Sequence, residues 1–232
     1  MKLRAVLFDL DGTLTKFLLD YKKVRFKAIE ILSEYDLKGV QLDPNISVYL
    51  TLKKVKDIID PSTFASIKKR IYQIYEEVEI EAAERVTRDT SVEILIKTLR
   101  EMNLKIGLVT NNGRIGTMKS LEKLGLRDAF DVIVTRDDSD ELKPDKGGMV
   151  KALRSLNVEP NEALFVGDSV ADIIAAKSAG LVSVAVPTGP FSVEELLKAA
   201  PDYFIDSVHS LPELIRYLNE SCEGSLEALN ES

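Results

Sequence analysis

The sequence has few of the features that point to secretion or to membrane insertion. Its 232 residues include one cysteine, Cys222, so no disulfide can form within the chain. No apolar run approaches the ~18 residues that a membrane-spanning helix needs. The apolar part of the N-terminal segment MKLRAVLFDL is too short for a signal peptide. These absences predict a cytoplasmic protein that has no membrane partner.

Positive charge is also scarce relative to negative charge. The formal net charge is −7, which argues against a nucleic acid or an anionic membrane as the main partner. An anionic substrate would then need positive charge placed locally at its site.

His209 is the single histidine, and we expect it to be a surface or capping residue. Cys222 lies in a polar, acidic tail, where we expect an exposed thiol without a role. The sequence makes no prediction of the oligomeric state.

What the chain does contain is a series of six short apolar runs that alternate with helix-like segments. None of the runs alternates cleanly between apolar and polar residues, which is typical of strands buried on both faces. Gly125 and Gly180 stand where two of the helices are expected to end. The pattern predicts an α/β fold, a doubly wound parallel sheet of Rossmann-like type. The runs cover residues 3–10, 104–110, 130–135, 162–168, 181–187 and 202–205.

Residues 16–85 interrupt this alternation, because they contain no strand pattern. They indicate three helices, over residues 21–35, 48–59 and 62–84, with Ser62 as the N-cap of the third. The insertion leaves from the carboxyl end of the first strand, which is the end where open parallel sheets bind ligands. We therefore expect a core formed by residues 1–15 and 86–232, and a helical cap, residues 16–85, that covers the site. The connections near Lys16 and Val86 would allow the cap to move as a lid.

Four carboxylates stand at the ends of predicted strands or one helical turn beyond. Like charges so close together repel one another, and their burial adds a desolvation cost. A hard divalent cation would offset both, and Mg²⁺ prefers oxygen ligands of this kind. The sequence therefore predicts a magnesium site. The four residues are Asp9, Asp11, Asp168 and Asp172.

Groups suited to a phosphate accompany these carboxylates. Thr110 ends a predicted strand, and Lys143 lies in the loop before a helix. The hydroxyl would supply a hydrogen bond and the lysine a positive charge. Lys146 stands three residues further and is the alternative to Lys143.

The segments DLDGTLT, LVTNN, LKPD and GDSVADI occur in this order, and in this the chain resembles the haloacid dehalogenase-like (HAD) hydrolase superfamily. The resemblance covers all four motifs of the core domain. The inserted helices resemble the cap of the phosphoglycolate phosphatase and beta-phosphoglucomutase branch. The match of LKPD favours Lys143 over Lys146. Thr15, Lys16 and Phe17 replace the valine, aspartate and serine that often continue the first motif in phosphoglycolate phosphatases, so the resemblance names no substrate.

The resemblance also implies a role for each motif residue. Asp9 would be the nucleophile that becomes an aspartyl phosphate, and Asp11 the general acid and base. The Asp9 side chain, the Asp11 backbone carbonyl and Asp168 would hold Mg²⁺, with Asp172 binding more indirectly. The transferring phosphoryl group would be held by Thr110, Asn111 and Lys143, with Gly12 allowing close approach of the backbone.

We therefore expect a Mg²⁺-dependent phosphatase acting on a small phosphorylated metabolite. Two alternatives remain open. One is a phosphomutase of the beta-phosphoglucomutase type, and the other is a non-catalytic protein that binds a phosphate or a partner. A dehalogenase is disfavoured, because the dehalogenases of the superfamily lack the acid at the position of Asp11.

Overall fold

The computed structural model describes the backbone of residues 2–230 and the side chains up to residue 220. Its centre is a six-stranded sheet in the order β3-β2-β1-β4-β5-β6, in which every pair of neighbours is parallel. All six predicted strands are present, and the doubly wound α/β fold is confirmed. The strands are β1 Ala5–Phe8, β2 Lys105–Val109, β3 Val132–Val134, β4 Ala163–Gly167, β5 Val182–Ala185 and β6 Tyr203–Phe204.

Helices cover both faces of the sheet. On one face α4 (Thr90–Glu101), α5 (Arg114–Leu124) and α9 (Leu211–Asn230) bury their apolar stripes against the strands, and on the other face α6 (Gly147–Leu156) and α7 (Val170–Ala179) do so. A short helix, α8 (Val193–Lys198), packs beside α7. Three 3₁₀ turns, η1 Arg136–Asp138, η2 Pro160–Glu162 and η3 Val208–Ser210, lie in the connections. This arrangement buries both faces of the strands and leaves their carboxyl ends to form a site.

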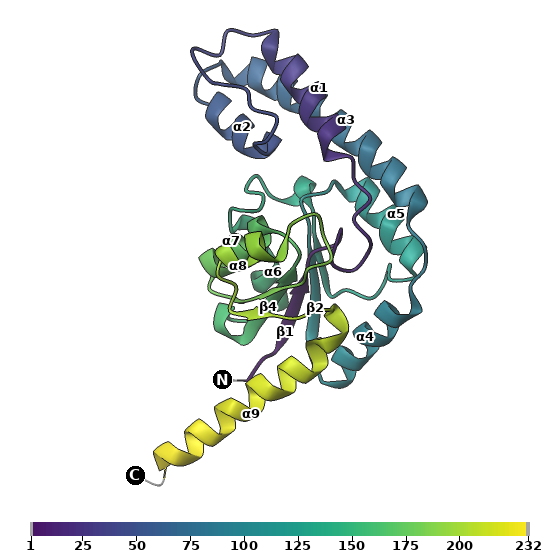
Figure 1. Cartoon of the computed structure of the whole chain (residues 1–232), viewed down its shortest axis with the longest axis vertical. Helices are drawn as coiled ribbons and strands as arrows, with labels where there is room; N and C mark the ends of the chain where they lie inside the picture. Colours follow the sequence, from purple (N-terminus) through teal and green to yellow (C-terminus); the bar gives the residue numbers. More distant parts are fainter. Residues whose placement is uncertain (1, 231–232) are drawn as a thin grey trace.

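The cap consists of three helices inserted after β1, namely α1 (Tyr21–Ser33), α2 (Val48–Val55) and α3 (Pro61–Arg85). Figure 1 shows them at one end of the molecule, with α3 running back toward the core beside α5. The three helices share an apolar core of their own, which includes Leu32, Val55, Ile67 and Ile71. The predicted helical cap is therefore confirmed as part of the fold.

Helix ends account for most of the differences from the sequence prediction. Gly125 and Gly180 do end α5 and α7, with φ of 75° and 81°, where a residue other than glycine would be strained. The prediction of Ser62 as an N-cap is wrong. Asp60 is the N-cap of α3, since its carboxylate accepts the backbone N–H groups of Ser62 and Thr63. Pro61 suits the first helical position, where its fixed φ fits and no N–H is needed.

The C-terminal region also differs in extent. Helix α9 continues to Asn230, so the backbone of the acidic tail is helical. The prediction for the Cys222 thiol lies outside the described side chains. His209 is exposed on η3, as expected for a surface residue, and its Nε2 lies 3.2 Å from the Ser91 hydroxyl. None of the helices among residues 2–230 combines the length and apolarity needed to cross a bilayer.

Candidate active site

Three of the predicted carboxylates meet at the carboxyl ends of β1 and β4. Asp9 and Asp168 directly follow these two neighbouring strands, and Asp172 lies in the first turn of α7. All three side chains are buried, and one oxygen from each lies within 4.8 Å of the others. The fold thus converges on the polar cluster that the strand ends predicted.

Lys143 lies against this cluster. Its Nζ is 2.6 Å from Asp9 Oδ1 and 2.6 Å from Asp172 Oδ1, and its side chain is 6% exposed. Burial alone would lower the pKa of Lys143, but the carboxylates of Asp172 and Asp9 raise it above its ordinary value. The lysine is therefore a fixed positive charge at the site. Lys146 is exposed at the N-terminus of α6, so the structure places Lys143, and not Lys146, beside the carboxylates.

A single lysine does not neutralise the cluster. Burial, together with Asp172, raises the pKa of Asp9 to about 6, although Lys143 opposes the rise. Burial and the neighbouring carboxylates of Asp172 and Asp9 raise the pKa of Asp168 to about 9. Further positive charge is needed to keep all of these groups ionised at neutral pH. A buried, all-oxygen donor set with this surplus of negative charge fits a hard divalent cation.

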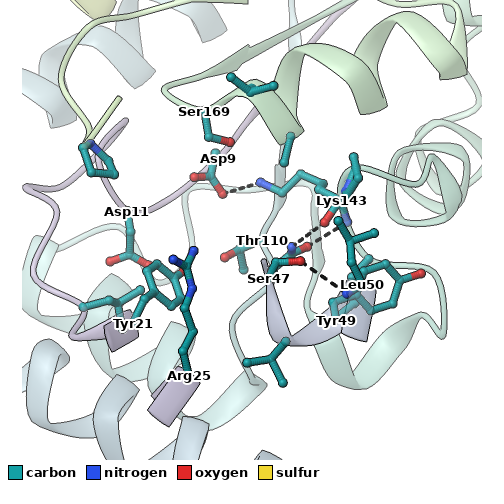
Figure 2. A pocket seen from close by; sticks show the side chains of 18 of the residues that line it. Asp9, Asp11, Tyr21, Arg25, Ser47, Tyr49, Leu50, Thr110, Lys143 and Ser169 are labelled. Atoms are coloured by element: carbon teal, nitrogen blue, oxygen red, sulfur yellow. Dashed lines mark hydrogen bonds and ion pairs between the residues drawn. The ribbon is translucent and has the colours of Figure 1, made fainter. Parts of the chain in front are cut away.

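The Asp11 side chain lies outside the three-carboxylate cluster and faces the cavity between core and cap (Figure 2). Its Oδ2 accepts a hydrogen bond of 2.5 Å from the side-chain amide of Asn112. Burial, followed by the charge of Asp9, raises the pKa of Asp11 to about 7. A carboxyl group with this pKa can donate and accept a proton near neutral pH.

The loop after β2 carries the predicted phosphate ligands, and its two side chains differ in what they can bind. Thr110 lines the cavity and its oxygen accepts the N–H of Asn112 at 3.2 Å, which leaves the hydroxyl proton available. The Asn111 amide instead bonds both backbone groups of Lys143, at 2.9 Å each. The Asn111 side chain therefore holds the Lys143 loop in place.

Gly12 is required by its neighbours as well as by its backbone. Its φ is 83°, and a Cβ at this position would lie 2.3 Å from Asp168 Oδ2. A Cβ on Gly189 would approach the same oxygen to 1.6 Å. Two glycines thus make room for the Asp168 carboxylate. Nothing in the sequence pattern pointed to Gly189, because it lies in an ordinary-looking loop after β5.

Comparison with known proteins agrees with this geometry. The family model described as haloacid dehalogenase-like hydrolase matches residues 6–186. The chain belongs to this family. A relative named "Putative pyrophosphatase PpaX" from Caldanaerobacter subterraneus subsp. tengcongensis is 32% identical over 224 residues, with 95% of this chain and 98% of that protein covered.

Solved structures show the same fold at lower identity. A hydrolase from Pseudomonas syringae is 22% identical with a TM-score of 0.68, covering 91% of this chain and 97% of that one. Beta-phosphoglucomutase from Clostridium difficile is 21% identical with a TM-score of 0.60, covering 97% and 99%. The HAD core with a helical cap is therefore shared along nearly the whole chain.

In this HAD hydrolase the cap and the core enclose a cavity of about 900 Å³. Core residues of the site form one wall, and the other wall comes from α1, from α2 with the segment before it, and from α3. Figure 2 shows Tyr21 and Arg25 of α1 pointing toward the side of the cavity where Asp11 and Thr110 lie. Phe17 and Tyr21, the two cap aromatics nearest the first motif in the sequence, also line the cavity. Arg25 was missed, since one arginine on an amphipathic helix carries no pattern of its own.

A buried ion pair ties the cap to the loop that follows β2. Glu79, on α3, lies 2.5 Å from Arg136 of η1, and their side chains are 1% and 4% exposed. Glu79 also accepts the N–H of Gly113 at 2.9 Å, while Arg136 donates to the backbone carbonyl of Asn111 at 3.1 Å. Both contacts hold the backbone of the loop that presents Thr110. Sequence reasoning missed this pair, because Glu79 is one of several acids in the third predicted helix.

Proposed function

We propose that this HAD hydrolase is a Mg²⁺-dependent phosphatase that hydrolyses a small phosphorylated metabolite through an aspartyl phosphate on Asp9. The observation that supports it most is the placement of Asp9. Its carboxylate touches Lys143, lies within the three-carboxylate cluster and borders the same cavity as the Asp11 carboxyl. The pyrophosphatase name of the relative also favours hydrolysis of a phosphoric bond.

Asp9, Asp168 and Asp172 are the side chains that would hold the Mg²⁺, and the Asp11 backbone carbonyl would join them as the family resemblance implies. The ion would supply positive charge to the carboxylates and to the phosphoryl oxygens. Lys143 adds a charge from the chain itself, and the Thr110 hydroxyl donates a hydrogen bond. Together these groups offset the repulsion between Asp9 and an anionic substrate.

The reaction then takes two displacements at phosphorus. A carboxylate oxygen of Asp9 attacks phosphorus, the bond to the leaving oxygen breaks, and Asp11 gives its proton to that oxygen. Asp11, now ionised, takes a proton from water as the water oxygen attacks the phosphorus. The bond between Asp9 and phosphorus breaks, and phosphate and the original enzyme are restored. The pKa of about 7 for Asp11 suits both proton transfers.

Release of inorganic phosphate from p-nitrophenyl phosphate tests this function. We expect turnover with Mg²⁺, no turnover after chelation, and no turnover by Asp9→Asn, whose amide is a poor nucleophile. A sugar phosphate should give free phosphate and not an isomer. An isomerised sugar phosphate without free phosphate would support the mutase instead, and binding without turnover of any phosphate ester would support a non-catalytic protein.

A further inference from the structure

The wall that the cap contributes to the cavity carries a positive charge with no carboxylate partner. Arg25 of α1 is half-buried and forms no ion pair within the described part of the chain. Within the described residues its one hydrogen bond is long, 3.4 Å, to the backbone carbonyl of Pro44. The other two buried cations of the cavity are occupied, Lys143 by Asp9 and Asp172, and Arg136 by Glu79. Arg25 is therefore available to an anion that enters the cavity.

The position of Arg25 along α1 indicates which part of a substrate it would meet. Tyr21 lies one helical turn before it on the same face, since residues four apart are neighbours on a helix. Figure 2 shows Tyr21 beside Asp11, and burial, followed by the Asp11 charge, raises the pKa of the Tyr21 hydroxyl well above its ordinary value. In the proposed reaction Asp11 faces the leaving oxygen. Arg25 points to the same side of the cavity as Asp11 (Figure 2), so it would face the leaving group.

We propose that Arg25 binds a negative charge on the leaving group, and that the substrate is a phosphoester or phosphoanhydride whose leaving group carries a second acidic function close to the scissile bond. This inference rests on the proposed function and names its substrate class. The chain has a net charge of −7, and the cavity is lined by Asp9, Asp11 and Asp168, so these charges would repel a second negative charge on the substrate. A doubly acidic substrate would therefore need a cation away from Lys143, and Arg25 would be that cation.

The second acidic function can be a phosphate or a carboxylate, and both offer the planar or forked oxygen pair that a guanidinium binds. The test therefore uses inorganic pyrophosphate and 2-phosphoglycolate, with 2-hydroxyethyl phosphate as the neutral counterpart of the latter. Phosphate release is measured with Mg²⁺ for the unaltered enzyme, Arg25→Gln and Arg25→Lys. Lys27→Gln is the matched control, because it removes the same charge from the same helix outside the cavity.

We expect the unaltered enzyme to prefer one or both acidic substrates over 2-hydroxyethyl phosphate. Arg25→Gln should lower kcat/KM for the preferred acidic substrate by on the order of 10- to 100-fold, the effect of losing a hydrogen bond to a charged group. The decrease in kcat/KM that Arg25→Gln causes for 2-hydroxyethyl phosphate should be at least about tenfold smaller. Arg25→Lys should recover part of the preference, and Lys27→Gln should retain it. A loss seen with pyrophosphate identifies the second group as a phosphate, and a loss seen with 2-phosphoglycolate identifies it as a carboxylate.

The outcomes separate this inference from the proposed function. If the enzyme hydrolysed neither p-nitrophenyl phosphate nor any of the three other substrates, the proposed function itself would be contradicted. Equal losses by Arg25→Gln on acidic and neutral substrates, with circular dichroism showing a folded protein, would overturn the role of Arg25 alone. A preference that depends on Lys22, the exposed lysine at the cavity rim, would also overturn it, and Lys22→Gln is measured alongside.

Discussion

Replacing Glu79 by alanine should destabilise this protein far more than replacing any exposed acid of the same helix. Glu79 accepts hydrogen bonds from Arg136 Nη1 at 2.5 Å, from Arg136 Nη2 at 3.1 Å and from the Gly113 N–H at 2.9 Å. Alanine removes all three acceptor contacts and leaves a guanidinium 4% exposed without its counter-charge. Tyr72 and Tyr75, whose rings lie about 5 Å from that guanidinium, cannot replace a carboxylate.

The magnitude follows from the burial. Removal of one partner from a buried ion pair costs about 3–5 kcal/mol, because the remaining charge is left uncompensated. For a chain of this length, each kcal/mol lowers Tm by roughly 2–4 °C, so Glu79→Ala should lower Tm by roughly 6–20 °C. The double variant Glu79→Met/Arg136→Met should recover much of the loss, since apolar residues of similar volume often replace a buried pair without cost.

Thermal unfolding followed by circular dichroism measures the Tm of Glu79→Ala and of the double variant. Glu81→Ala is the matched control on α3. Glu81 is 60% exposed and, among the residues with described side chains, pairs only with Lys23, at 3.1 Å, so its loss should shift Tm by a small fraction of the Glu79 effect. If Glu79→Ala and Glu81→Ala lowered Tm equally, the Glu79–Arg136 pair would not hold the cap to the core. A double variant less stable than either single variant would contradict the charge argument as well.

Three further predictions concern the site. Lys143→Ala should lower kcat/KM for phosphate esters by on the order of 100-fold or more, whereas Lys146→Ala should leave it near the unaltered value; comparable losses in a phosphate-release assay would reverse that assignment. The rate of ester cleavage should fall as pH rises through about 7, where Asp11 loses the proton that it donates, and a rate–pH profile that stays flat from pH 6 to 9 would exclude that role. Calcium should not replace magnesium, because the larger ion takes additional ligands and would capture the second oxygen of Asp9; full turnover with Ca²⁺ alone would contradict this.

Much of the fold was predictable because each strand and helix is specified by local chemistry. The apolar runs identify β1 to β6, and Gly125 and Gly180 identify two helix ends, since both signals depend on a few adjacent residues. The N-cap of α3 was predicted at the wrong residue, because the local sequence offers two suitable caps. Asp60 and Ser62 are both good caps, and only the preference for proline at the first helical position decides in favour of Asp60.

The site was predictable to the extent that it lies at strand ends. Asp9 and Asp168 follow adjacent strands, so parallel topology alone brings them together. Arg25 and Glu79 could not be found in this way, because their roles depend on how the cap helices lie over the core. A helix exposes several charged side chains at similar spacing, and the sequence does not say which one meets Arg136 or faces the cavity.

Direct trapping of the phosphoenzyme tests the central claim. The enzyme is mixed with Mg²⁺ and a hydrolysed substrate, quenched in acid within the first turnover, and digested for mass spectrometry of the peptide that contains Asp9. We expect a phosphoryl group on Asp9, formed and lost at rates that account for kcat. Rapid release of inorganic phosphate, with no phosphoryl group on Asp9 at any time point, would contradict the account.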